Sequence, residues 1–440
     1  MSLPKYGEYK ESSVEWIGEI PSHWSIKPIK RGFSVVGGST PKSDEAAYWD
    51  GEIVWVSPAD LSKLPSLYIS DSNRKITPEG LSSCGTTLVP SNSIVLSTRA
   101  PIGSLAIAAT TLCTNQGCKS LVPKDEVVSR YFAYVLISAT TPLNLRGKGT
   151  TFLELSADEL SAFSVPYPSK NEQVEIANFL DRETAKIDAL ISEQEKLIAL
   201  LAEKRQATIS HAVTRGLNPD LPMKDSGVDW LGDVPAHWSV CPLKLSARIG
   251  NGSTPNRDNP NYWAEEGFPW LNSSVVNEDE ASEAGRFVTE LALKECHLPV
   301  IVPPAVLVGI TGQGKTRGMA TRLVFTATVN QHLAYIKPSE ECFIESYLLR
   351  VFEAAYQHLR TESEGAGSTK GAITCGQLGN LRIPMPSIPE QMEIASFLDK
   401  VVAKLDALKD EAENGVMLFK ERRSALIAAA VTGKIDVRHA

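Results

Sequence analysis

The sequence lacks long hydrophobic runs and has no CxxC motif among its seven cysteines. No apolar stretch approaches the roughly 20 residues that a membrane-spanning helix needs. The first residues, MSLPKYGEYKESS, also lack the apolar core of a signal peptide. Because the cysteines are odd in number and lack a ligand spacing, we interpret them as buried, reduced thiols. We therefore expect a cytoplasmic protein with no membrane segment and no metal site.

The chain also lacks the excess of basic residues that is typical of a simple nucleic-acid binder, since its net charge is −8. The acidic excess lies in residues 217–386, which carry 19 acidic and 14 basic residues. Any contact with phosphates must therefore come from a local patch or from a basic partner. At 440 residues, the chain is long enough to bury two hydrophobic cores.

A long helix is predicted from Ser169 to about Gly216. Ser169 and Glu172 form a capping box behind two prolines, which is typical of a helix start. Apolar residues then follow a three-four spacing that describes one hydrophobic stripe: Ile176, Leu180, Ile187, Leu190, Leu197 and Leu201. Such a stripe needs a partner helix. At about 1.5 Å per residue, a helix of about 45 residues is on the order of 65 Å long and can act as a ruler.

The partner helix is predicted within the same chain. From Ser387 onward, EQMEIASFLDKVVAKLDAL follows EQVEIANFLDRETAKIDAL at a constant offset. Two related helices of one chain can pack antiparallel with a pseudo-two-fold axis. The second helix contains Gly415 where the first has Leu197, and an interior glycine costs about 1 kcal/mol relative to alanine. We therefore expect the second helix to be bent or loosened near Gly415.

The segments between the helices are also repeated. All eight tryptophans fall into four pairs, a GSTP tetrapeptide occurs at Gly38 and Gly252, and an Asn-Gln pair occurs at Asn115 and Asn330. Short β-rich runs alternate with Gly, Pro, Ser and Asn clusters, which is typical of an α+β domain. The predicted organisation is two tandem mixed α/β domains and an antiparallel pair of long helices: a domain at 1–168, a helix at 169–216, a domain at 217–386 and a helix at 387–440.

On these repeated motifs, the sequence resembles the specificity (S) subunit of a Type I restriction-modification system. The resemblance implies that each domain is a target recognition domain that reads one half of a bipartite, asymmetric DNA site. It implies that the helices set the spacer and dock two methyltransferase (modification) subunits, and that a restriction/translocase subunit joins them. S-adenosylmethionine, ATP and Mg would then be bound by the partner subunits, and this chain would bind double-stranded DNA without being an enzyme.

The candidate DNA-binding residues are small donors, amides and bases in predicted turns, where hydroxyls meet phosphates and long side chains reach base edges. They are Ser39, Thr40, Lys42, Arg99, Arg146, Lys148, Thr150, Ser253, Thr254, Asn256, Arg257, Gln313, Lys315, Arg317 and Lys370. For the GSTP loops, a purely structural turn is an equally good interpretation. The candidate partner-binding residues are the apolar helix positions Ile187, Leu190, Leu197, Leu201, Leu405, Leu408 and Phe419.

Two other functions have to be weighed. GITGQGKT at 309–316 matches the P-loop pattern and would make the chain a nucleotide hydrolase, but a β-rich run follows it where a P-loop needs a helix. We expect a hairpin tip there. A coiled-coil scaffold without a DNA role is the other alternative. The repeated His23 and His237 are interpreted as packing against the adjacent tryptophans, and the repeated Asp188 and Asp406 as a solvated face or a partner salt bridge.

Overall fold

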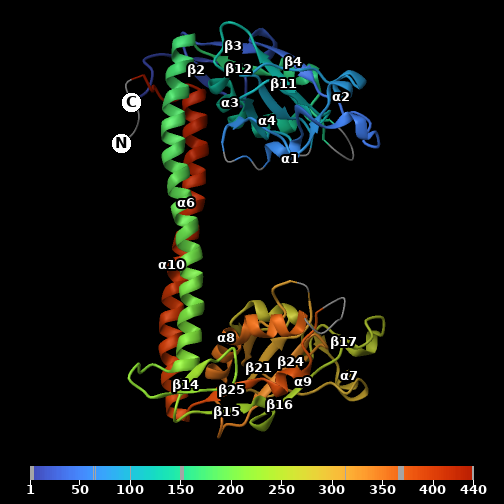
Figure 1. Ribbon diagram of the computed structural model, residues 1–440, viewed down its shortest axis with the longest axis vertical. Helices are drawn as coiled ribbons and strands as arrows, with labels where there is room; N and C mark the ends of the chain where they lie inside the picture. Colours follow the sequence, from blue (N-terminus) through green and yellow to red (C-terminus); the bar gives the residue numbers. More distant parts are fainter. Residues whose placement is uncertain are drawn as a thin grey trace. The chain divides into compact units, whose positions relative to one another are not determined.

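The computed structural model describes residues 4–62, 64, 66–99, 101–148, 153–312, 314–364 and 371–438. Contacts divide the chain into two compact units, residues 1–194 with 414–440 (unit 1) and residues 195–413 (unit 2). Two long helices run through both units (Figure 1), namely α6 (Lys170–Arg215) and α10 (Ile388–Val431). The two long helices expected from the sequence are therefore present.

Unit 1 is built on a mixed five-stranded sheet in the order β4-β11-β8-β9-β6. Its central strand β8 is buried on both faces, as its apolar sequence IVLS suggests. All neighbours are antiparallel except β9 and β6. The strands are β4 (Phe33–Gly37), β6 (Tyr68–Ile69), β8 (Ile94–Ser97), β9 (Leu105–Ala108) and β11 (Cys118–Pro123).

A second sheet of unit 1 has the order β10-β5-β7, and the unit also contains two separate strand pairs. These strands are β5 (Trp49–Val56), β7 (Lys75–Ile76) and β10 (Cys113–Thr114), with the pairs β1 (Tyr9–Glu11) and β2 (Glu19–Pro21), and β3 (Ser25–Pro28) and β12 (Ser164–Tyr167). The helices are α1 (Pro58–Leu61), α2 (Pro78–Ser83), α3 (Ser129–Ser138), α4 (Thr140–Leu145) and α5 (Ala157–Ala162). Helix α3 is almost entirely buried and carries much of the core.

Unit 2 repeats this topology, with a five-stranded sheet in the order β16-β24-β21-β22-β19. Those strands are β16 (Ala247–Asn251), β19 (Glu280–Ala281), β21 (Ala305–Gly309), β22 (Ala320–Leu323) and β24 (Leu333–Pro338). The others are β13 (Met223–Asp225), β14 (Asp233–Pro235), β15 (Ser239–Pro242), β17 (Trp263–Ala264), β18 (Phe268–Leu271), β20 (Phe287–Val288), β23 (Thr328–Val329) and β25 (Arg382–Met385). The helices are α7 (Glu290–Glu295), α8 (Glu345–Glu364) and α9 (Cys375–Asn380). The prediction of two tandem α+β domains is confirmed.

The long helices pack antiparallel within each unit. In unit 1, Ile176 and Leu180 of α6 share a core with Ile427 and Val431 of α10. In unit 2, the end of α6 meets the beginning of α10 in the same way. The repeated aspartates lie between the helices, since Asp188 Oδ1 is 2.8 Å from Arg423 Nε and Asp406 Oδ1 is 3.1 Å from Arg205 Nε. Both aspartates therefore form salt bridges within the chain rather than a purely solvated face.

Each globular segment also holds the beginning of one long helix. In unit 1, Glu172 closes the predicted capping box with Ser169 and accepts hydrogen bonds from His23 at 2.8 Å and Trp24 at 3.1 Å. Glu390 accepts the equivalent bonds from His237 and Trp238 at 2.9 and 3.2 Å in unit 2. The packing expected between His237 and Trp238 is present, with ring centroids 6.3 Å apart, but each histidine also bonds to a helix carboxylate, which the sequence did not predict.

A buried tyrosine fixes the end of the other helix in each unit. The Tyr131 hydroxyl lies 3.2 Å from the carbonyl of Val431 and 3.4 Å from that of Pro166. The Tyr347 hydroxyl lies 3.3 Å from the carbonyl of Val213 and 3.4 Å from that of Pro384. Because the last carbonyls of a helix have no partner within it, the hydroxyl satisfies a group that burial would otherwise leave unpaired.

The two local expectations about glycine-containing segments have opposite outcomes. Helix α10 continues without interruption through Gly415, so the loosening expected there is wrong. Packing over both flanking stretches outweighs the small helix penalty of one glycine. The hairpin expected at GITGQGKT is confirmed, since β21 before it and β22 after it pair antiparallel and no helix follows the motif.

Within the described ranges, no helix is both long enough and apolar enough to cross a membrane. The same residues contain no group of three or more His, Cys, Asp or Glu that could hold a metal ion. All seven cysteines are free thiols, and of these Cys113 and Cys118 are buried while the other five are partly exposed.

Candidate nucleic-acid interface

The backbone of the GSTP loop in each unit packs directly against the end of a neighbouring strand. A Cβ atom placed on Gly38 would lie 2.1 Å from the carbonyl oxygen of Asn115, and one on Gly252 would lie 1.7 Å from that of Val329. No side chain fits at such distances from a backbone oxygen. The glycine is therefore required by close approach, and the loop has a fixed position against the Asn-Gln turn.

Four of the repeated tryptophans hold the same loops. In unit 1, the indole N–H groups of Trp49 and Trp55 each donate a 3.0 Å hydrogen bond to the loop carbonyls of Lys42 and Ser39. In unit 2, Trp263 and Trp270 donate 3.1 Å bonds to the carbonyls of Asn256 and Ser253. The rings of each pair meet edge to face, at 5.2 and 5.1 Å between centroids. The tryptophans thus fix the backbone of the loops and leave their side chains to vary.

The loop threonines bind the Asn-Gln turns. Thr40 donates to Gln116 in unit 1, and Thr254 donates to Gln331 at 2.6 Å in unit 2. The asparagine of each turn accepts a bond from the backbone two residues on, as expected for an Asx turn. For these threonines the structure shows an internal partner, so the structural interpretation of the hydroxyls has direct support.

Two further segments extend this surface in unit 1. The backbone N–H of Thr98 donates to the carbonyl of Gly117 at 2.8 Å, and Leu155 donates to Thr98 at 2.9 Å. In unit 2, Ile310 donates to His332 at 2.9 Å, and Ile373 donates to Ile310 at 2.8 Å. We call the joined surface the four-segment face: the GSTP loop, the Asn-Gln turn, the tip after the central strand, and the segment before the last short helix of each unit.

The basic candidates on the four-segment face of unit 1 pair with two glutamates. Arg99 Nη2 lies 2.9 Å from Glu154, and Lys148 Nζ lies 2.8 Å from Glu159, with Arg146 at 3.9 Å from the same carboxylate. The hydrogen bond from Lys148 holds the pKa of Glu159 below its ordinary value. These bases are partly exposed and could exchange a carboxylate for a phosphate. Lys42 is exposed, and Thr150 lies outside the described residues.

In unit 2 a polar pocket of about 640 Å³ adjoins this face, where the GSTP loop and the Asn-Gln turn meet the residues that follow β18. It combines two guanidinium groups with several amides, which is the donor and acceptor set that reads base edges. Its lining is Thr254, Asn256, Arg257, Trp270, Asn272, Ser273, Arg286, Asn330, Gln331 and His332. Asn272, Arg286 and His332 were missed from the sequence, although His332 directly follows the repeated Asn-Gln pair and Asn272 follows Trp270 by two residues.

Comparison with known proteins bears on this geometry. The family model described as "Type I restriction modification DNA specificity domain" matches residues 21–199 and 235–416. The chain belongs to this family. The Type I restriction enzyme MjaIX specificity subunit of Methanocaldococcus jannaschii is 29% identical over 443 residues, which cover 98% of this chain and 97% of the relative. The EcoR124I/EcoR124II specificity subunit of Escherichia coli is 27% identical over 186 residues, covering 40% of this chain and 42% of the relative.

Two solved structures share the fold of this member of the specificity family. One comes from work on complex assembly and conformational transition of the type I R-M system, with a TM-score of 0.68 and 17% identity over 94% of this chain and 98% of that chain. The other is the HsdS subunit from Thermoanaerobacter tengcongensis, with a TM-score of 0.54 and 16% identity over the same shares. Neither the nucleotide hydrolase nor the scaffold without a DNA role gains support.

Two hairpin candidates of this family member, Lys315 and Arg317, are absent from the lining of the pocket. The DNA-binding role predicted for Arg317 is corrected, because its side chain is buried and its guanidinium pairs with Glu364 at 2.7 Å. Lys315 lines a different groove, of about 610 Å³, with Arg205, Tyr356 and Leu405. Gln313 and Lys370 lie outside the described residues.

The predicted partner-binding residues on the helices fall into two groups. Ile187, Leu201 and Leu405 are buried in the helix pair, so for these three the expected partner surface is corrected to an internal contact. Leu190, Leu197 and Leu408 are exposed, and Phe419 is partly buried. Leu200 and Leu418, at equivalent places in the two helices, were missed although they are 60% and 65% exposed.

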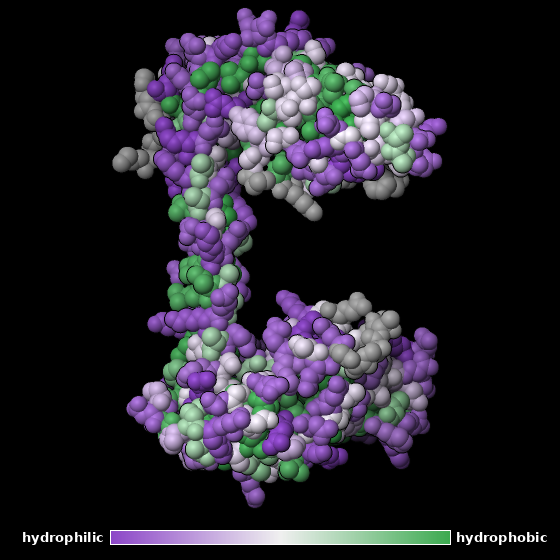
Figure 2. Space-filling view, in the orientation of Figure 1, coloured by the Kyte–Doolittle hydropathy of each residue, from purple (hydrophilic) through white to green (hydrophobic). Residues whose placement is uncertain are grey.

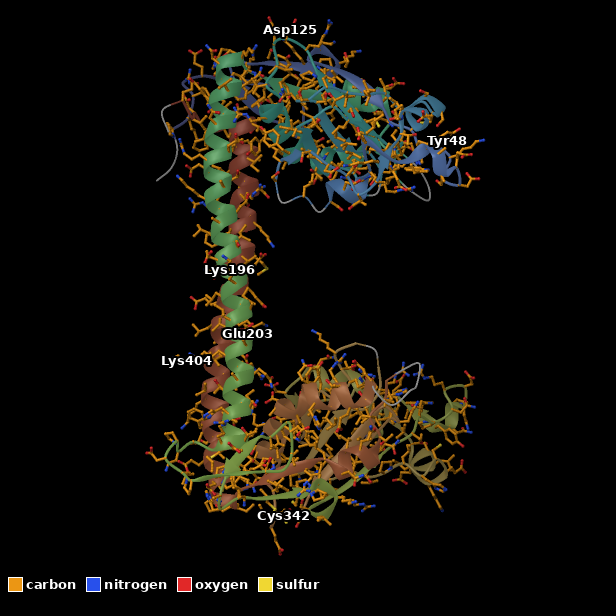
Figure 3. All side chains as sticks on the ribbon, viewed as in Figure 1. Tyr48, Asp125, Lys196, Glu203, Cys342 and Lys404 are labelled. Carbon is orange, nitrogen blue, oxygen red and sulfur yellow. The ribbon has the colours of Figure 1, made fainter. Side chains whose placement is uncertain are left out.

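These leucines lie among charged residues. The space-filling view shows hydrophobic surface on the helix pair next to hydrophilic surface (Figure 2). The charged neighbours include Lys196 and Glu203 on α6 and Lys404 on α10, which are labelled in Figure 3. A contiguous apolar patch is typical of a surface that binds a protein partner, and these leucines are the candidates for such a patch.

Proposed function

We propose that the chain is the DNA sequence-specificity subunit of a Type I restriction-modification complex and that each domain reads one half of a bipartite, asymmetric DNA site. One observation carries the proposal. The four-segment face is framed by the same glycine, tryptophan and threonine contacts in both units, but it displays different side chains. Lys42 and Arg99 in unit 1 are replaced by Asn256 and Thr311 in unit 2. A constant frame with different reading groups suits two unlike half-sites.

The chemistry of the exposed groups supports this assignment. Guanidinium groups and amides form paired hydrogen bonds with base edges in the major groove, whereas lysines and hydroxyls mainly contact phosphates. Arg257 and Arg286 line the pocket of unit 2 together with amide side chains. The net charge of −8 limits the number of phosphate contacts from this chain, so basic partner subunits are expected to supply others.

The proposal gives the helices two roles. The exposed leucines of α6 and α10 dock two methyltransferase subunits, and a restriction/translocase subunit joins the assembly. S-adenosylmethionine, ATP and Mg are bound by these partners, so this chain acts in the cytoplasm as a non-catalytic reader. The helices also set the length of the unread spacer. Inserting one helical turn, about 5.4 Å, into both helices should lengthen that spacer by about one or two base pairs, and an unchanged spacer would remove the ruler role.

A domain exchange tests the assignment of the half-sites. Residues 1–168 are replaced by the first domain of another specificity subunit, and residues 169–440 are kept. The exchanged chain and the natural chain are each produced with the methyltransferase subunit, and the methylated motif is mapped by long-read sequencing. One half-site should change and the other should stay. A motif that stays whole, or that changes in both halves, contradicts the proposal.

A further inference from the structure

One position on the four-segment face carries three charged groups in unit 1. The guanidinium of Arg99 lies 2.9 Å from one oxygen of Glu154, and the amine of Lys119 lies 3.9 Å from the other oxygen. The backbones of Arg99 and Glu154 are also joined by an antiparallel bridge. One carboxylate therefore serves two cations at the point where the strand tip, the Asn-Gln turn and the last segment meet.

The strand register identifies the equivalent position in unit 2. Cys118 pairs with Ser97 in unit 1 as Leu333 pairs with Gly309 in unit 2. One residue after Cys118 lies Lys119, and one after Leu333 lies Ala334. The bridge of Arg99 with Glu154 corresponds in the same way to the bridge of Thr311 with Ala372.

All three charged residues are thus replaced by small uncharged ones in the second copy. Thr311 bonds the neighbouring His332 at 2.7 Å instead of a carboxylate. The frame is the same in both units, so folding alone does not require the charges. Their presence in one copy only is what a position that determines specificity should show.

The exposure of the two cations separates their roles. The side chain of Lys119 is only 13% exposed, so Glu154 mainly neutralises its amine. The side chain of Arg99 is 45% exposed, and a guanidinium has five N–H donors in a rigid plane. The ion pair with Glu154 restrains the guanidinium at the strand tip, and its partial exposure leaves donors open to solvent. A group that is oriented before binding loses less entropy when it binds.

We propose that Arg99 reads a guanine in the half-site of unit 1 and that Glu154 is its positioning residue. An oriented guanidinium matches the O6 and N7 acceptors of guanine, the most common specific contact in the major groove. The proposal rests on the proposed function, because it assigns one base of a site that the chain must first be shown to read.

The test uses the full chain in complex with its methyltransferase subunits. The methylated motif and the binding of DNA duplexes with single base replacements are measured for the natural chain and for Arg99→Ala, Arg99→Lys, Glu154→Gln and Glu154→Asp. Arg99→Ala should lose the preference for guanine at one position of one half-site, by about 5- to 140-fold. Arg99→Lys keeps the charge but not the planar fork and should relax the same position. Glu154→Gln should relax it less, and Glu154→Asp should recover part of the preference.

Arg31→Ala, a change at an exposed base of the same unit, serves as the control and should leave the motif unchanged. If all Arg99 variants keep the motif, or if they weaken binding to every sequence equally, Arg99 is not a base reader and the proposal is overturned. A variant that relaxes the other half-site overturns it as well. If the natural chain itself supports no sequence-specific methylation, the proposed function fails, which is a distinguishable result.

Discussion

His23 Nε2 lies 2.8 Å from the carboxylate of Glu172, and the same contact recurs between His237 and Glu390 at 2.9 Å. Each pair joins the beginning of a long helix to the globular segment packed around it. The carboxylate also accepts the adjacent indole N–H and belongs to the helix cap. A single glutamate therefore couples helix initiation to the placement of the domain.

Glu172→Gln should lower the free energy of unfolding by about 1.5–3 kcal/mol at neutral pH, the range for hydrogen bonds to a charged group. Burial raises the pKa of Glu172, but the bonds from His23, Trp24 and Ser169 outweigh it, and the pKa lies below its ordinary value. Stabilisation from a lowered pKa is present above the unfolded pKa of about 4.3 and is lost as the pH falls through the folded pKa.

Urea unfolding from pH 7 down to pH 4 and below checks this expectation. The difference in the free energy of unfolding between the natural chain and Glu172→Gln should be constant near pH 7 and should shrink at the acidic end. Glu175→Gln is the matched control, because this exposed glutamate lies one turn along the same helix. The free energy of unfolding of Glu175→Gln should stay within about 0.5 kcal/mol of that of the natural chain. A loss from Glu172→Gln that does not depend on pH would show that the charge of the carboxylate is irrelevant.

Gly37, the last residue of β4, and Gly38, the first residue of the GSTP loop, should respond differently to alanine. Gly38→Ala places a methyl group 2.1 Å from a carbonyl oxygen and should cost about 1–3 kcal/mol or displace the loop. Gly37→Ala meets nothing within 4 Å and should be nearly neutral. Thermal unfolding measures the stability, and the methylated motif reports the loop. Equal effects of the two changes would contradict the close contact with the Asn-Gln turn.

The indole N–H groups of unit 2 allow a matched pair of substitutions. Trp270→Phe removes the 3.1 Å bond to the Ser253 carbonyl and should cost about 0.5–1.5 kcal/mol while weakening recognition of one half-site. Trp230 has a buried N–H with no hydrogen-bond partner among the described residues. Trp230→Phe should therefore remove only buried apolar surface of the ring and no hydrogen bond. Duplex binding by the assembled complex checks both. Weaker binding from Trp230→Phe, with Trp270→Phe unaffected, would remove the role of Trp270.

The repeats made much of the fold predictable, because two copies of each tryptophan and of each helix cap mark the same places in two domains. Contacts between residues far apart in the sequence were harder to predict. Both His23 and Glu172 are repeated, yet a single sequence does not say that they touch, and the histidines were assigned to packing. Arg317 was predicted to contact DNA from a turn, but its side chain is buried and pairs with Glu364 of α8. Such pairings depend on tertiary structure.

The helix stripe shows the same limit. Its three-four spacing predicted a buried face, and Ile176, Leu180, Ile187 and Leu201 are buried. Leu190 and Leu197 are exposed, whereas the residues that directly follow them, Ile191 and Ile198, are buried and partly buried. Spacing alone does not say which leucines face the internal helix and which remain for another protein.

Gly415→Ala should stabilise the chain. Gly415 lies inside the continuous helix α10, and a Cβ there would meet nothing within 4 Å. Alanine reduces the backbone entropy lost on folding, which contributes about 0.5–1 kcal/mol at a helix interior. Urea unfolding should show this gain in the isolated chain. The equivalent residue of α6 is the exposed Leu197, so this place in the repeat accepts a side chain. If the isolated chain gains stability but binds the methyltransferase subunit more weakly, the glycine is needed for close approach of that partner. A loss of stability in the isolated chain would contradict the open surroundings of Gly415.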